Sequence, residues 1–581
     1  MKRRKLISVA LACAGLCLVS ACGGSSSSSS GSAAFDAGNT SIVNASDATG
    51  GTLNYGMTNQ FDSVDPGNTY YAFSWNFSRL YAVPLLSYNP APGKAGENLV
   101  PGLATGMGTT SADGLTWTYH LKSGMKFADG EPITSADVKY AVERTFAKDV
   151  LPNGPAYFQT YLANAANYPG PYKDKDPNGL AAIETPDDTT VVFHLSQKFS
   201  DFNYLVANPQ TAPVPPAKDT GANYQTQVVG SGPYTIKPGS VNPTTGFSLI
   251  KNPYWKSSND PYIKQTADQI NVSFNLAADD LDNRLLSGSI DLDLYGTGLN
   301  TAARSKVLSS AQLKKNTDAA LSGFLWYYPI DTQVIPNVDC RKAVEYAADK
   351  TLFQNAYGGD LAGGDIASTV LPPNIIGYNK FDDYEALTQP GGDIQKAKDE
   401  LAKCGKPTGF SFNVAVRGDR PKEVASAQAL QTALAKVGIK IDILQYPTGQ
   451  YGTSYIGSPS FMQQHNIGMG TYGWEADWPD GFGFLYSIAS GNAILQAGNS
   501  NISMLNDPQV NNLLNQAAAT KDQAQQTQIY QQIDKIMMDQ ATVLPEVYAK
   551  SLLYRPSDLT NVYVSSVFGM YDYTQIGKKS S

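Results

Sequence analysis

Apolar and polar positions alternate in several short segments along the chain. Residues 115–121 alternate cleanly. Four other short segments are also rich in apolar residues: 53–57, 191–195, 270–274 and 439–443. Alternation with a period of two turns one face of a segment toward a core and the other toward solvent, which is typical of a β-strand. We therefore predict strands at these five places.

Segments with a helical period lie between these strands. Thr134 and Asp137 have the spacing of a capping box, and the apolar residues after them recur three or four positions apart, as on one face of a helix. Asp507 precedes Pro508, a suitable first residue for another helix. Because strands and helices are mixed over the whole length, the pattern indicates an α/β protein. Further helices are predicted over residues 281–286, 340–349, 424–437 and 529–537.

The composition excludes some classes of function. Hydrophobic residues make up 42% of the chain and charged residues 16%, as in a globular protein. Asp and Glu number 51 against 43 Lys and Arg, and no basic cluster follows residue 5. This balance argues against nucleic acid as a partner. With only 3 His residues, we expect no metal site and no cofactor.

Residues 1–21 have the pattern of an export signal. Basic residues 1–5 precede an apolar run over residues 6–19, which is short for a membrane span. Small residues then precede Cys22, as in the lipobox of bacterial lipoproteins, so Cys22 is the predicted lipidation site. The alternative is ordinary signal cleavage, which leaves Cys22 as a free thiol. Because a Gly- and Ser-rich run follows directly, we expect residues 22–50 to be a lipidated Cys with a flexible tether.

Two cysteines remain after the signal and the lipidation site. Cys340 and Cys404 form an even pair in a chain that is expected to be exported, so they are candidates for a disulfide. The alternative is two buried free thiols. A metal site built from two thiols without a nearby His is not expected.

Motifs of known enzyme chemistry are missing from the sequence. Residues 468–473 match the dinucleotide fingerprint by letters only, because Pro479 and the acids around it cannot form the helix which that fingerprint requires. Glu475, Asp477 and Asp480 form a cluster of acids with three interpretations: a solvated loop, a catalytic pair as in glycoside hydrolysis, or a ligand-binding site. We expect no enzymatic activity and favour ligand binding.

Several stretches, in order along the chain, resemble the family 5 bacterial extracellular solute-binding proteins, which are the oligopeptide, dipeptide and nickel binders of ABC importers. The resemblance extends from about residue 50 to about residue 575, which is nearly the whole chain after the predicted signal. It is carried by residues 50–53, 99–104, 113–121, 124–130, 133–138, 230–234, 251–255, 340–350 and 473–480.

The resemblance implies a two-lobed, periplasmic-binding-protein-like α/β fold of class II, cluster C type, with an extra N-terminal subdomain. Lobe one would comprise residues 51–80, 205–320 and 545–581. The extra subdomain would comprise residues 81–204, and lobe two residues 321–544. The ligand would lie in the cleft between the lobes.

In the peptide-binding members of this family, an Asp after a Gly-Trp pair binds the α-ammonium group of the ligand. Asp477 occupies that position here. The sequence departs from the family pattern at the other end of the ligand, where Arg417 and Arg420 are the only candidates for a carboxylate partner. Trp326 and Tyr327 lie in an apolar run, so a core position is the alternative for both. The other candidate ligand-binding residues are Gly473, Trp474, Trp478, Tyr70 and Tyr71.

The expected function is to capture peptides outside the cell and deliver them to the permease and ATPase subunits of an ABC importer. The protein would act as a monomer on the outer face of the cytoplasmic membrane, held there by its lipid. Oligosaccharide capture by the same fold is the first alternative, because aromatic residues make up 10% of the chain. Nickel binding, surface sensing and a secreted hydrolase are more distant alternatives.

Overall fold

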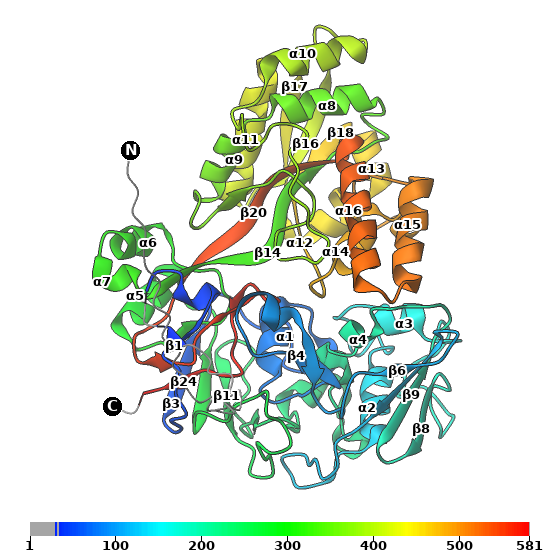
Figure 1. Ribbon diagram of the computed structural model, residues 1–581, viewed down its shortest axis with the longest axis vertical. Helices are drawn as coiled ribbons and strands as arrows, with labels where there is room; N and C mark the ends of the chain where they lie inside the picture. The colour runs from blue at the N-terminus through cyan, green and yellow to red at the C-terminus, as the bar shows by residue number, and fades with distance from the viewer. Residues whose placement is uncertain (1–29, 32–33, 580–581) are drawn as a thin grey trace, which may run out of the picture.

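The computed structural model describes residues 30–31 and 34–579, so the predicted signal and Cys22 lie outside the described residues. The chain forms two lobes, and the long strands β14 (Thr317–Pro329) and β20 (Val543–Tyr554) run between them (Figure 1). None of the helices within residues 34–579 combines the length and the apolar character that a membrane span requires.

The first lobe contains a five-stranded sheet with the order β10-β11-β12-β3-β13. Strand β3 lies inside this sheet, and it pairs in parallel with β12 and β13, which follow it by more than 200 residues. Leu53 and Tyr55 of β3 are buried, so alternate side chains of the strand enter the core, as the sequence pattern predicts. The strands span Thr52–Gly56 (β3), Tyr234–Ile236 (β10), Gly246–Lys251 (β11), Gln269–Ser273 (β12) and Leu292–Asp293 (β13).

A second sheet, with the order β6-β7-β9-β8, lies beside this lobe and is covered by helix α2 (Figure 1). The predicted capping pair is present at the start of α2, where the backbone N–H and the hydroxyl of Thr134 both donate to Asp137 Oδ2, at 2.7 and 2.8 Å. Farther along, Tyr157 begins the short helix α3. The elements span Thr109–Thr110 (β6), Thr116–His120 (β7), Ser135–Arg144 (α2), Tyr157–Tyr161 (α3), Ile183–Asp187 (β8) and Thr190–His194 (β9).

The other lobe is built around a parallel sheet with the order β17-β16-β18. Helices α8 and α10 pack against each other there, and Cys340 and Cys404 are joined as a disulfide between them, with their Cα atoms 5.4 Å apart. The elements span Val338–Ala347 (α8), Lys350–Tyr357 (α9), Ile394–Lys403 (α10), Ser411–Arg417 (β16), Pro421–Ala435 (α11), Lys440–Tyr446 (β17), Ile467–Gly470 (β18), Gly481–Ala489 (α14), Pro508–Ala519 (α15) and Gln523–Asp539 (α16).

The two crossing strands belong to a four-stranded sheet with the order β15-β20-β14-β19, in which β15 spans Gly364–Ile366 and β19 spans Tyr472–Glu475. Gly364 has a φ of +139°, and a Cβ there would lie 2.1 Å from the carbonyl oxygen of Tyr548. Only glycine therefore fits where β15 meets β20. Because β19 is an edge strand, its outer side is free of a strand partner within the described chain.

Residues 34–46 pack on the first lobe, so this part of the predicted tether (residues 22–50) is ordered against the fold. The backbone N–H of Ala319 donates to Asp36 Oδ1 at 2.6 Å, and Arg555 donates to the carbonyl oxygen of Ala34 at 2.6 Å. A β-bridge then joins Val43 to Val562. The sequence of residues 34–46 has little helical or strand pattern. It does not predict these contacts, because the partners are more than 280 positions away in the chain.

Candidate functional site

The candidate site is built on the edge strand β19. Its register on β14 places Gly473 opposite Trp326 and Glu475 opposite Phe324. Gly473 and Glu475 therefore share one face of the strand. A Cβ at residue 473 would lie 2.1 Å from Cε1 of Phe324, so this position requires glycine, and the rings of Phe324 and Trp326 lie 4.9 Å apart beside it.

Asp477 lies two positions after the end of β19 and is held by two tyrosines, Tyr70 of the first lobe and Tyr157 of helix α3. The hydroxyl of Tyr70 donates to Asp477 Oδ2 at 2.9 Å, and the hydroxyl of Tyr157 donates to the same oxygen. Burial raises the pKa of Asp477 to about 6, and the two hydroxyl donors limit this rise. The carboxylate thus has hydrogen bonds but no positive partner among the described residues, and it can accept a cation from a ligand.

A cavity of about 400 Å³ lies between the lobes at this point. Tyr70 is 43% exposed there, and Trp474, whose Nε1 donates to the carbonyl oxygen of Phe484 at 2.8 Å, is fixed in the wall. The lining is mainly aromatic and acidic, which suits a cationic or amphipathic small ligand. The lining residues are Tyr70, Tyr71, Ala72, Trp75, Phe324, Gly473, Trp474, Glu475, Ala476, Asp477, Ser487, Ser500, Val567 and Phe568.

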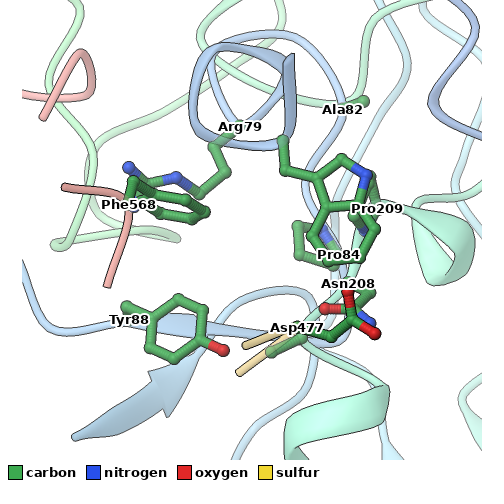
Figure 2. Close-up of a pocket in the computed structure, with 10 residues that line it drawn as sticks. Arg79, Ala82, Pro84, Tyr88, Asn208, Pro209, Asp477 and Phe568 are labelled. Atoms are coloured by element: carbon green, nitrogen blue, oxygen red, sulfur yellow. The ribbon is translucent and has the colours of Figure 1, made fainter. Parts of the chain in front are cut away.

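A smaller pocket, shown in Figure 2, shares Trp75, Asp477 and Phe568 with the main cavity. Arg79 lies in its wall, but its guanidinium is bound to Asp572 at 2.8 Å and is therefore neutralised. Asn208 is 2% exposed, and its Nδ2 has no hydrogen-bond partner in the described part of the chain. A buried amide donor of this kind is costly unless a ligand or water accepts its hydrogen bond.

Two predicted ligand-binding residues lie in the core instead. Trp478 is 1% exposed, and its Nε1 donates to Asp480 Oδ1 at 3.0 Å and to Asp201 Oδ2 at 3.3 Å. Tyr327 is also 1% exposed, because the alternation of β14 turns it away from the face that carries Phe324. Neither lines the cavity, and the expectation that Trp478 and Tyr327 contact the ligand is corrected.

The remaining candidates divide into lining and supporting residues. Tyr70, Tyr71, Gly473, Trp474 and Asp477 line the cavity together. Trp326 instead stacks on Tyr357 with ring centroids 5.1 Å apart, and Arg417 Nε donates to Glu423 at 2.9 Å. Arg417 lies over the ring of Trp326, which in turn contacts the lining residue Phe324, so both support the wall without lining the cavity.

Tyr157 of the extra subdomain, whose hydroxyl donates to Asp477, was not predicted from the sequence. Phe324, Phe568 and Asn208 were not predicted either. The sequence around them carries no pattern that points to a ligand, since each residue acquires its place only through the tertiary contacts of its own segment.

These features define a two-lobed protein with a candidate ligand-binding cavity between its lobes. The family model "Bacterial extracellular solute-binding proteins, family 5 Middle" matches residues 98–496, and the chain belongs to this family. Its members are extracellular or periplasmic proteins that bind solutes, and this confirms the predicted family and fold class.

Individual relatives span most of the chain. It is 26% identical over 509 residues to Heme-binding protein A of Haemophilus influenzae, covering 82% of this chain and 84% of that protein. It is 27% identical to the Probable D,D-dipeptide-binding periplasmic protein DdpA of Escherichia coli, covering 82% and 85%. The solved structure of Clavulanic acid biosynthesis oligopeptide binding protein 2 is 38% identical, with a TM-score of 0.91, covering 94% of this chain and 99% of that one.

Proposed function

We propose that this protein captures peptides in the cleft between its lobes and delivers them to the permease of an ABC importer. It would act as a monomer on the outer face of the cytoplasmic membrane, anchored through a lipid on Cys22. The binding role requires no catalysis, and the site residues proposed for it bind and orient the ligand only.

The observation that carries the proposal is Asp477, a carboxylate without a positive partner in the cavity wall, oriented by Tyr70 and Tyr157. In a cavity that excludes water, such a carboxylate fixes the position of a ligand ammonium group. Desolvation offsets much of the attraction, so Asp477 contributes position and selectivity as well as affinity. Several relatives are named as binding proteins for dipeptides, tripeptides or oligopeptides, which supports the same ligand class.

The free edge of β19 supports an extended ligand. A peptide backbone can pair with the exposed N–H and C=O groups of an edge strand while its side chains enter pockets on either side. Such pairing accepts varied sequences, because the backbone groups are the same in every peptide. Because residue 473 is glycine, no side chain at this position of β19 obstructs a ligand backbone.

Thermal melting of the mature chain without its tether tests the proposal. The ligands would be di- to octapeptides with free amino termini, cello- and xylo-oligosaccharides, and Ni²⁺. We expect the peptides to raise the melting temperature, because a ligand that binds only the native state stabilises it by mass action. A response to oligosaccharides alone would support the alternative that the aromatic lining favours and would contradict the peptide proposal.

A further inference from the structure

The cavity wall contains a second carboxylate close to Asp477. Glu475 lines the same cavity, and because Asp477 lies two positions farther along the chain, the Cα atoms of the two acids are at most about 7 Å apart. Burial and the charge of Asp477 together raise the pKa of Glu475 to about 8. No basic side chain of the described chain lines this cavity, so the protein itself does not compensate either charge.

Three other buried acids of the same fold each have an arginine as an ion-pair partner. Arg144 Nη2 lies 2.6 Å from Asp65, Arg555 Nε lies 2.8 Å from Asp318, and, as described above, Arg79 binds Asp572. A buried charge is costly unless it is paired. Each of these three acids has an arginine of the chain as its partner. For the two acids of the cavity, a ligand is the available source of positive charge.

The rest of the site suits the same kind of ligand. The rings of Tyr71, Phe324, Trp474 and Phe568 line the cavity, and aromatic faces attract ammonium and guanidinium groups. The unpaired amide of Asn208 in the adjoining pocket is a second group that requires a ligand or water. As a donor beside Asp477, it is placed to bind an oxygen atom near the ligand ammonium group.

We infer that the cleft selects peptides whose first residue is lysine or arginine, with the α-ammonium group on Asp477 and the side-chain cation on Glu475. This inference rests on the proposed function and names the substrate class of the same site. A lysine or arginine side chain is long enough to span the separation between the two carboxylates. A ligand with one positive charge compensates only one of them.

Isothermal titration at pH 7.5 with three tripeptides tests the inference. The peptides are Lys-Gly-Gly, norleucine-Gly-Gly, which has the same stem without the charge, and Gly-Lys-Gly, which moves the charge to the second residue. We expect Lys-Gly-Gly to bind at least about tenfold more tightly than the other two, since hydrogen bonds to charged groups are stronger than those between neutral groups. Equal affinities would overturn the inference while leaving the proposed function intact. No binding of any peptide would contradict both.

The variant Glu475→Gln separates the role of the charge from that of the shape. We expect it to bring the ratio of the affinities for Lys-Gly-Gly and norleucine-Gly-Gly close to one. The matched control is Glu131→Gln, at an exposed acid outside the cavity, which should keep the preference. A preference that persists in Glu475→Gln would assign the selectivity to another group and overturn the inference. The comparison of the three peptides with the unaltered protein stands even if the variant folds poorly.

The number of protons released on binding depends on the charge of Glu475, and a change in packing alone does not alter it. Asp477, Tyr70 and Tyr71 are the other titratable groups that line this cavity. Because the pKa of Glu475 is raised to about 8, most free protein at pH 7.5 holds the proton on this carboxyl, and a bound cation displaces it. Titrations in buffers of different ionisation enthalpy should show proton release with Lys-Gly-Gly and markedly less with norleucine-Gly-Gly. Equal release with both peptides would contradict a cation on Glu475.

Discussion

Asp477→Ala is expected to weaken the binding of free-amine peptides by at least about 30-fold. Removing one partner of a buried, hydrogen-bonded charge pair costs about 2–5 kcal/mol, and part of this cost is the ammonium group left without a partner in the closed cleft. The hydroxyls of Tyr70 and Tyr157 lose their shared acceptor at the same time. Isothermal titration of one tripeptide against both proteins measures the difference.

The pH dependence of the unaltered protein checks the same carboxylate without a mutation. Since the pKa of Asp477 is raised to about 6, the free carboxylate is lost as the pH falls through this value. The affinity for a tripeptide without a basic side chain should therefore fall by about tenfold for each pH unit below 6. Asp477→Asn, which keeps the shape and removes the charge, should show a flat profile over this range. A persistent fall in the Asn variant would assign the effect to another group.

Replacing both cysteines of the second lobe by serine is expected to destabilise that lobe by about 4 kcal/mol. The disulfide between Cys340 and Cys404 closes a loop with a sequence separation of 64, and loss of this constraint increases the entropy of the unfolded chain. Differential scanning calorimetry should show a transition lowered by roughly 10 °C, given a shift of about 2–4 °C per kcal/mol for a unit of this size.

Reduction provides the control for this prediction. In excess dithiothreitol, the unaltered protein should melt at the same temperature as the double variant. Dithiothreitol should not change the melting temperature of the variant. Peptide affinity should stay the same in both, because neither cysteine lines the cavity. If the variant melted within about 2 °C of the oxidised protein, the stabilising role of the disulfide would be excluded.

Local patterns predict the secondary structure of this chain well. The alternating residues 115–121 correspond to β7 (Thr116–His120), and the capping box marks the start of α2 as expected. Asp507 caps α15 through two backbone N–H groups. These features depend on neighbouring residues, so they can be recognised before any tertiary contact is known.

Predictions that depend on tertiary contacts fared less well. Alternation shows that Trp326 and Tyr327 point to opposite faces of β14, but it does not show which face meets the cleft. Trp478 was expected at the ligand because of its neighbour Asp477, yet its side chain enters the core and binds Asp201. Burial is decided by the elements that pack over a residue, and these come from distant parts of the chain.

The candidate site was predictable in one part only. The position of Asp477 follows from a local resemblance, whereas its partner Tyr157 lies 320 positions away. The second acid, Glu475, is visible in the sequence, but the lack of a compensating basic residue becomes clear only when the whole lining is assembled. Electrostatic balance is a property of the folded cavity and has no local sequence pattern.

The most direct test of the account is the affinity of one tripeptide with and without an N-terminal acetyl group. Acetylation removes the α-ammonium charge and leaves the rest of the peptide unchanged. The account predicts tight binding of the free peptide by isothermal titration and a loss of at least about 30-fold on acetylation, because Asp477 then faces a neutral group. Equal affinity for the two peptides would contradict the proposed role of Asp477 as the anchor of the ligand ammonium group.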